Sequence, residues 1–267
     1  MRLRPIAAIV LRQLYLMRSS PVRVVPMIAW VAIDIVLWGF IARYLNSVTS
    51  TGINFTATLL GAVLFWDLFT RVMQGVTMGF FEEVWSRNFI NIFASPLLIT
   101  EYLTGLVLTG VATSLVSLIV MLILSSAMFG LHFAALGLLL VPFLLVLFLF
   151  GIALGVLASA MVLRLGPASE WLVWPIPALL SPFVGVFYPL ATLPAWMRGV
   201  GLALPPSYVF EAMRSFLAGG GYHSSALIAG VALATLYVVL AGWVFTAVHR
   251  YAVRSGLLAR YSAESVG

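Results

Sequence analysis

The sequence predicts an all-α polytopic membrane protein. We expect six transmembrane helices, an N-terminal amphipathic interface helix, a re-entrant helical pair before the last span, and both termini in the cytoplasm. Of the 267 residues, 63% are hydrophobic and 8% are charged, whereas a soluble domain has about 25% charged residues. The apolar residues also come in runs of about 20, the length that crosses the hydrocarbon core of a bilayer.

The apolar runs place the six spans near residues 24–45, 56–80, 104–129, 133–163, 168–190 and 226–249. Most of the fourteen arginines precede the first span, follow the last, or lie in the loops after the second and fourth spans. By the positive-inside rule, this face is cytoplasmic. The early run PIAAIVL is interrupted by Arg12 and lacks a small-residue cleavage site, so the first span is expected to act as the insertion signal.

We expect a single membrane domain over residues 1–267. Its parts outside the spans are an interface helix at 1–22, a cytoplasmic coupling loop at 81–103, external re-entrant helices at 191–217 and a cytoplasmic tail at 250–267. These segments are too short to fold alone, so any driving force must come from another protein.

Residue types that are missing from the sequence exclude several functions. The chain has no lysine and no cysteine, which rules out a Walker A nucleotide site, Schiff-base chemistry and thiolate metal sites. The sequence HExxH and the sequence GxSxG are also missing, so we expect no enzyme activity and no cofactor bound by this chain. The basic pI reflects arginines placed as topology signals, and we expect no nucleic-acid partner.

The N-terminal segment RLRPIAAIVLRQLYLMRSSP has apolar residues at helical spacing, including Ile6, Ile9 and Leu14, with arginines between them. This pattern predicts a helix that lies in the cytoplasmic interface among lipid headgroups. The helix could be a positive flank only, or it could also contact a cytosolic partner.

Two predicted spans carry charged residues. In the second span a polar stripe lies on one helical face, formed by Asp67, Thr70, Arg71, Gln74 and Thr77. In the first span, Asp34 lies between Trp30 and Trp38 at spacings of four. A charge in the bilayer centre costs roughly 2.5–3.5 kcal/mol, so the stripe should not face lipid. It forms either a buried polar contact with Asp34, in which Asp67 and Arg71 neutralise each other, or one wall of a translocation path.

The segment between the second and third spans combines charge with apolar residues. The acidic pair Glu82–Glu83 is followed by Arg87 and by a short amphipathic piece that contains Phe89 and Phe93. Interfacial anchoring would explain the aromatic residues alone. A docking helix for a cytosolic protein explains both features.

Residues 187–217, FYPLATLPAWMRGVGLALPPSYVFEAMRSFL, are apolar but interrupted by prolines. The preceding span also contains Pro175, Pro177 and Pro182. Because each proline removes a backbone donor, this backbone must be shielded by protein or lie beside a watery cavity. LPAWMRGVGLAL and PPSYVFEAMRSFL each predict a half-length helix that enters and leaves on the external side, and Glu211 can pair with Arg214.

The order of these features resembles the ABC-2 type permeases, the membrane subunits of one class of ABC exporters. The residues that carry the resemblance are FYPLATLPAWMRGVGLALPPSYVFEAMR before the last span and, in the coupling region, Glu82–Glu83 followed by SPL. The resemblance covers nearly the whole chain. One departure is the doubled Pro205–Pro206, which should shift the start of that helix only slightly.

The resemblance implies a dimer of two copies with two cytosolic ABC ATPase subunits, which would bind Mg-ATP. It implies that the coupling region contacts the ATPase and that the second and fifth spans line the path. The coupling residues would be Glu82, Glu83, Arg87, Phe89 and Phe93; the path residues Asp67, Arg71, Gln74, Trp171, Trp174, Phe183 and Phe187; and the external gate Tyr208, Glu211 and Arg214.

We therefore expect an export permease in the bacterial inner membrane, in contact with membrane lipids. The aromatic residues along the expected path suit lipid-linked or polysaccharide cargo, other amphipathic molecules, and drugs. The alternative is an ion-coupled secondary transporter or channel that uses Asp34, Asp67 and Arg71.

Overall fold

The structure is a computed structural model that describes residues 2–19, 21–49, 55–86, 88, 91–92, 95–131, 137–138, 140–220 and 224–257. Within these residues the secondary structure is helical, with no strand. In the described part of the chain, five helices are long and apolar enough to cross a membrane: α2 (Pro21–Val48), α3 (Gly61–Trp85), α5 (Ile99–Phe129), α6 (Leu140–Leu165) and α10 (Ser224–Arg254). The predicted all-α multi-pass membrane class is confirmed.

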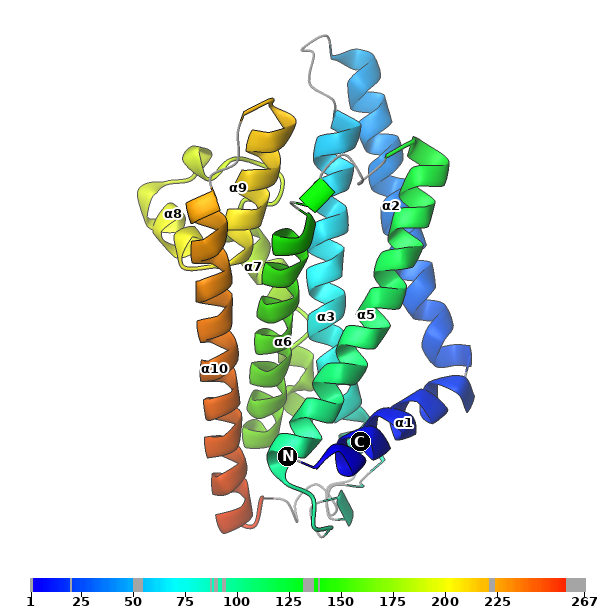
Figure 1. The fold of residues 1–267 in the computed structure, drawn as a ribbon, viewed down its shortest axis with the longest axis vertical. Helices are drawn as coiled ribbons and strands as arrows, with labels where there is room; N and C mark the ends of the chain where they lie inside the picture. Colours follow the sequence, from blue (N-terminus) through cyan, green and yellow to red (C-terminus); the bar gives the residue numbers. More distant parts are fainter. Residues whose placement is uncertain are drawn as a thin grey trace.

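The five long helices run along the long axis of the molecule, and the shorter helices lie at its two ends (Figure 1). Helix α1 (Leu3–Ser19) crosses one end obliquely, whereas α8 (Ala195–Leu202) and α9 (Pro206–Leu217) lie at the other. We call these the α1 end and the α9 end. Helix α2 runs from the α1 end toward the α9 end, and α3 returns, beginning with a π-helical turn, η1 (Thr56–Leu60).

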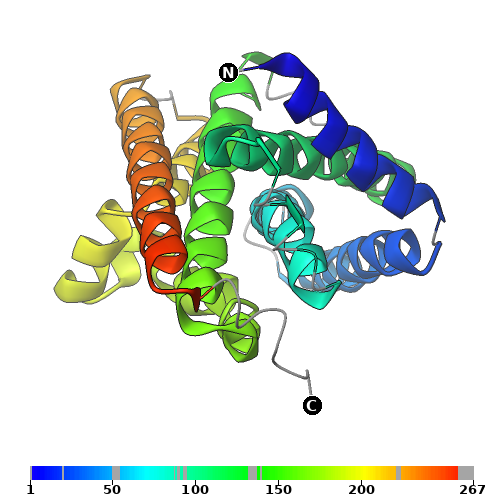
Figure 2. The same ribbon diagram turned by 90° about the horizontal axis from the view of Figure 1, so that it is seen from below.

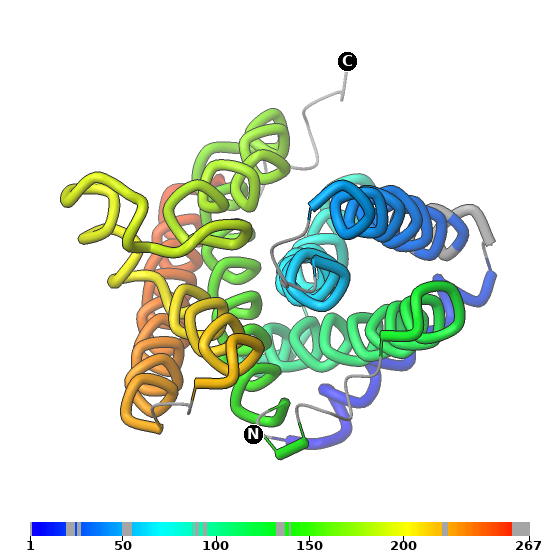
Figure 3. Tube along the Cα trace, turned by 90° about the horizontal axis from the view of Figure 1, so that it is seen from above, coloured from blue at the N-terminus to red at the C-terminus, as the bar shows by residue number. Residues whose placement is uncertain are grey.

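Helix α3 is the central helix of the bundle, with α5, α6 and α2 around it (Figures 2 and 3). Close approach depends on glycine. A Cβ atom on Gly75 would lie 2.8 Å from the Cα of Gly110 on α5, and one on Gly155 of α6 would lie 2.8 Å from the carbonyl oxygen of Met73. Small residues allow such backbone contacts between membrane helices. Buried aromatic rings, such as those of Phe69 and Phe150, fill the remaining core.

The predicted fifth span, 168–190, is not one continuous helix. It consists of a 3₁₀ helix, η3 (Pro167–Leu172), a bend, and the nine-residue helix α7 (Ile176–Val184). At 1.5 Å per residue, α7 is about 14 Å long, about half the thickness of the hydrocarbon core. Prolines interrupt the hydrogen-bond ladder, and Gly185 ends α7 with a φ of 68°, in the left-handed region that suits glycine.

The predicted pair of short helices before the last long helix does form. A short 3₁₀ turn, η4 (Leu190–Thr192), precedes α8 and α9. Pro194 caps α8 in an extended conformation and Pro206 occupies the first turn of α9, where its missing N–H is tolerated. The segment between α3 and α5 is shorter than the predicted loop of 81–103, because α3 continues to Trp85 and α5 begins at Ile99.

Candidate functional site

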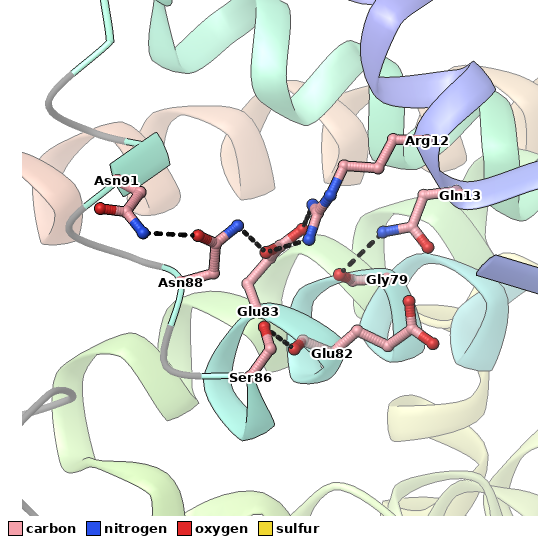
Figure 4. Close-up of polar contacts among 8 residues, drawn as sticks. All are labelled: Arg12, Gln13, Gly79, Glu82, Glu83, Ser86, Asn88 and Asn91. Atoms are coloured by element: carbon pink, nitrogen blue, oxygen red, sulfur yellow. Dashed lines mark hydrogen bonds and ion pairs between the residues drawn. The ribbon is translucent and has the colours of Figure 1, made fainter. Parts of the chain in front are cut away.

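At the α1 end, an ion pair ties the interface helix to the end of α3. The guanidinium group of Arg12 donates through both terminal nitrogens to the carboxylate of Glu83, with Nη2 3.0 Å from Oε2 (Figure 4). The Glu83 side chain is only 1% exposed and that of Arg12 is 37% exposed. Nearby, Nε2 of Gln13 lies 3.4 Å from the carbonyl oxygen of Gly79. Helix α1 is therefore anchored to the last turns of α3.

A second ion pair ties the beginning of α1 to the beginning of α5. Arg2 donates from its backbone N–H to Oε1 of Glu101 at 2.8 Å, and from Nη2 to Oε2 at 3.2 Å. The hydrogen bond to Glu101 and its negative charge raise the pKa of Arg2 above its usual value, so the guanidinium stays charged. Glu101 also accepts from the backbone N–H of Leu98 at 3.1 Å, which caps α5.

Together the two pairs place α1 across the segment that joins α3 to α5. A cavity of about 460 Å³ lies between α1 and this segment, bordered by Arg2, Ile9, Arg12, Asn88 and Pro96, among others. Asn88 also donates to Glu83 at 3.3 Å. The segment is therefore linked to α1 through the Arg2 contact with the carbonyl oxygen of Pro96, and to the end of α3 through Asn88.

The predicted coupling residues are only partly within the described chain. Glu83 forms the ion pair with Arg12, whereas the Glu82 side chain points away from Arg12 (Figure 4). Arg87, Phe89 and Phe93 lie outside the described residues. Sequence reasoning missed the partners Arg12, Arg2 and Glu101. An arginine within the apolar pattern of α1 and an acidic residue in the first turn of α5 were the available signals.

In the membrane-spanning part of α3, the polar stripe is half-buried rather than enclosed: Asp67, Thr70, Arg71 and Gln74 all keep some exposure. Nη1 of Arg71 lies 3.3 Å from Oε1 of Gln74. No ion pair joins Asp67 to Arg71 in the described part of the chain, so the expected mutual neutralisation is not formed as a direct contact. Oδ2 of Asp67 and Nε of Arg71 are both buried without a hydrogen bond.

Helix α2 brings a third charge close to this stripe. Asp34 is half-buried, and both Asp34 and Asp67 interact electrostatically with Arg71. No hydrogen bond links Asp34 to the stripe among the described residues. The first two spans therefore hold two acidic groups and one basic group near one another without direct pairing.

Several aromatic residues of the predicted fifth span, 168–190, are exposed. Trp171 is 74% exposed and Phe187 is 40% exposed, while Trp174 is 41% exposed. Phe183 is half-buried and meets Trp196 of α8 with ring centroids 6.1 Å apart. The Phe187 ring stacks on Trp38 of α2 with centroids 4.9 Å apart and an angle of 14° between the planes. This stack was not predicted from the sequence, because the two residues are far apart along the chain.

At the α9 end, side chains form hydrogen bonds with backbone groups of the segment that the prolines interrupt. Arg214 donates from Nη1 to the carbonyl oxygen of Gly185 at 2.7 Å, and Glu211 accepts from the backbone N–H of Leu190 at 2.7 Å. The predicted pairing of Glu211 with Arg214 is confirmed, with Nη2 2.7 Å from Oε1. Tyr208, the third predicted gate residue, donates its hydroxyl to the carbonyl oxygen of Leu202 at 2.9 Å.

Two more side chains bind backbone carbonyl oxygens at the α9 end. Arg198 donates from Nη2 to the carbonyl oxygens of Ala191 and Leu193 at 3.1 and 3.3 Å. The hydroxyl of Tyr237 on α10 lies 3.2 Å from the carbonyl oxygen of Ala203. Unpaired backbone groups are costly at membrane depth, and these bonds replace the helical ladder that the prolines interrupt.

A comparison with protein-family models finds the same family that the sequence resembles. A model described as "ABC-2 type transporter" matches residues 6–218, which run from α1 through α9. No curated protein matches the sequence. Members of this family are transport permeases that associate with an ABC ATPase and typically lack an ATPase site of their own. The chain belongs to the ABC-2 type transporter family as the membrane permease component of an ABC transporter.

Proposed function

We propose that this permease exports its cargo along the face of α3 that carries the polar stripe, at an interface between two copies of the chain. The observation that carries the proposal is that Asp67, Arg71 and Gln74 are half-buried, and keep some exposure, in the middle of a helix suited to cross a membrane. Exposed to lipid, each charge would cost roughly 2.5–3.5 kcal/mol. A second copy and a solvated path would remove that cost.

Exposed apolar side chains on the same molecule support pairing. Trp171 and Trp174 are exposed near the end of α3, where Glu170 binds Trp85, and α2 exposes Leu37 and Phe40. Large exposed apolar patches mark interaction surfaces with protein or membrane.

The α1 end would face the cytoplasm and contact two ATPase subunits. Arg12–Glu83 and Arg2–Glu101 connect α1 with both sides of the segment that was predicted to dock the ATPase. Closure of the ATPases on ATP binding would push this segment, and the two ion pairs would pass the movement to α3 and α5. The α9 end would then be the external side, with α8 and α9 as re-entrant helices. The η3–α7 segment would be the fifth of six crossings, and α10 the sixth.

The proposed cargo is amphipathic: a lipid-linked molecule, a polysaccharide or a drug. Charged groups on α2 and α3 would bind polar parts, and the exposed tryptophans would contact sugar rings or apolar parts. The proposed location is the bacterial inner membrane.

The test is to purify the chain with the ABC ATPase that we expect an adjacent gene to encode. A stable complex of two permeases and two ATPases, with ATP hydrolysis stimulated by the permease, is the expected result. An Arg12→Gln variant should lower that stimulation, whereas Arg18→Gln, on the same helix, should not. If the two proteins form no complex, the proposal is wrong.

An ion-coupled carrier or channel is the second candidate, because Asp34, Asp67 and Arg71 lie near one another without direct pairing. Reconstituted vesicles that contain the chain alone distinguish the two functions. Ion-gradient-driven flux without an ATPase or ATP would favour the carrier, whereas flux that needs both would favour the exporter.

A further inference from the structure

The stack of Phe187 on Trp38 joins α2 to the residues that follow α7, and these two helices pack mainly on different neighbours. Helix α2, which carries Trp38, packs on α5, η1 and α3, whereas α7 packs on α8 and α9. Seen from the α9 end, α2 and α7 lie on opposite sides of α3 (Figure 3). The two rings meet with centroids 4.9 Å apart, nearly parallel.

The position of the stack along the molecule follows from the direction of α2. This helix runs toward the α9 end, and Trp38 follows Asp34 by one turn. The stack therefore lies closer to the α9 end than Asp34, and Asp34 lies within electrostatic range of Arg71 in the stripe. The Trp38 ring is therefore one helical turn closer to the α9 end than the group of α2 that interacts with the stripe.

The backbone on the Phe187 side is held by α9. Arg214 binds the carbonyl oxygens of Gly185 and Val186, at 2.7 and 3.3 Å, directly before Phe187. Glu211 binds the N–H of Leu190, three residues after Phe187, and also binds Arg214. Helix α9 is itself fixed by core residues, among them Val209, Phe210 and Met213. Phe187 is thus attached to a rigid support, whereas its partner ring belongs to α2.

We propose that Trp38 and Phe187 form the closed constriction at the α9 end of the path, and that Arg214 is the positioning residue that holds Phe187 in it. The path opens when α2 moves away from the α7–α9 unit and the two rings separate. Glu211 and Arg214 then act as the fixed support of the constriction rather than as moving gate charges. This inference rests on the proposed path along α3.

Cysteine labelling in membrane vesicles tests the constriction, because the 267-residue chain has no cysteine of its own. A single cysteine in place of Thr70, in the stripe, reports access from the α9 side. A membrane-impermeant maleimide is added on the side from which a cysteine at exposed Val200 of α8 is labelled. Stacked aromatic pairs shift an equilibrium by about 2- to 10-fold, so Trp38→Ala and Phe187→Ala should each speed labelling at position 70 by that factor.

The matched control is Trp196→Ala, which removes an exposed ring at the same end that contacts Phe183 rather than α2. It should leave the labelling rate at position 70 unchanged. Equal rates for the parent, Trp38→Ala and Phe187→Ala would overturn the constriction. The measurement needs no nucleotide, cargo or ATPase, so its result is independent of whether the proposed export function holds.

Arg214→Gln tests the positioning role. It should speed labelling at position 70 as Phe187→Ala does, and combining the two changes should give no further increase, because both act on the same ring. Arg198→Gln, which removes another arginine bound to carbonyl oxygens of this region, should have a smaller effect. Additive effects of Arg214→Gln and Phe187→Ala would show general loosening of the α9 end and would overturn the positioning role.

Discussion

Replacing Arg12 by glutamine would test whether α1 is held on the bundle by its ion pair with α3. In the native chain Arg12 forms two hydrogen bonds to a carboxylate, on Glu83, that is almost fully buried. Glutamine is too short to reach the same carboxylate with two donors. Among the described residues, the variant therefore leaves a buried negative charge with one side-chain donor, the Asn88 amide at 3.3 Å.

The size of the effect follows from these exposures. Removing one partner of a fully buried pair costs about 3–5 kcal/mol, whereas an exposed pair contributes about 0–1 kcal/mol. Glu83 is 1% exposed but Arg12 is 37% exposed, so the pair lies between these limits. We expect Arg12→Gln to weaken the attachment of α1 by about 2 kcal/mol, which is about a 30-fold rise in its detached population.

Hydrogen exchange of the α1 backbone amides measures this population directly, because local opening limits their exchange. Residues 3–19 should exchange about 30-fold faster in Arg12→Gln than in the native chain, with α6 and α10 unchanged. Arg18→Gln is the matched control: Arg18 lies exposed in the last turn of the same helix. Unchanged exchange of α1 in Arg12→Gln would refute the reasoning.

Three further predictions concern packing, coupling and the polar stripe. Gly75→Val should lower the melting temperature by several degrees or prevent folding, because even the Cβ atom would lie 2.8 Å from the α5 backbone. Gly242→Ala is the control and should leave the melting temperature unchanged, because position 242 faces open space. Glu83→Arg should reduce ATP hydrolysis coupled to transport without preventing membrane insertion. The measurement uses vesicles that contain the ATPase, and unchanged coupling would contradict the proposed contact between the α1 end and the ATPase. Asp67→Asn should reduce transport without lowering the melting temperature, because it removes a negative charge whose Oδ2 atom is buried without a hydrogen bond. A large loss of stability with normal transport would indicate a purely structural role for Asp67.

The sequence predicted the parts of the fold that depend on composition and on local pattern. Long apolar runs correspond to the five long helices, and the amphipathic N-terminal pattern corresponds to α1. Proline spacing predicted two short helices close to the positions of α8 and α9. The 168–190 segment was harder to predict. Its hydropathy fits a span, but its prolines and the left-handed Gly185 leave a continuous helix of only nine residues.

The candidate site was less predictable, because its main contacts join residues that are distant in sequence. Glu211 and Arg214 are three residues apart on one helix, and their pairing was predicted. Arg12 with Glu83, Arg2 with Glu101, and Trp38 with Phe187 depend on how helices pack, which one sequence does not specify. Asp67 and Arg71 have the spacing of an ion pair, yet spacing alone does not determine where their side chains turn.

We propose that the polar face of α3 lines a path whose access is controlled by ATP. The most direct measurement places a single cysteine at Gln74, in the permease–ATPase complex in vesicles, and compares its labelling from each side with and without ATP. We predict that the side from which position 74 is labelled changes with the nucleotide state. A cysteine that is labelled from neither side, or equally in every nucleotide state, would contradict the account and identify the stripe as a static polar contact.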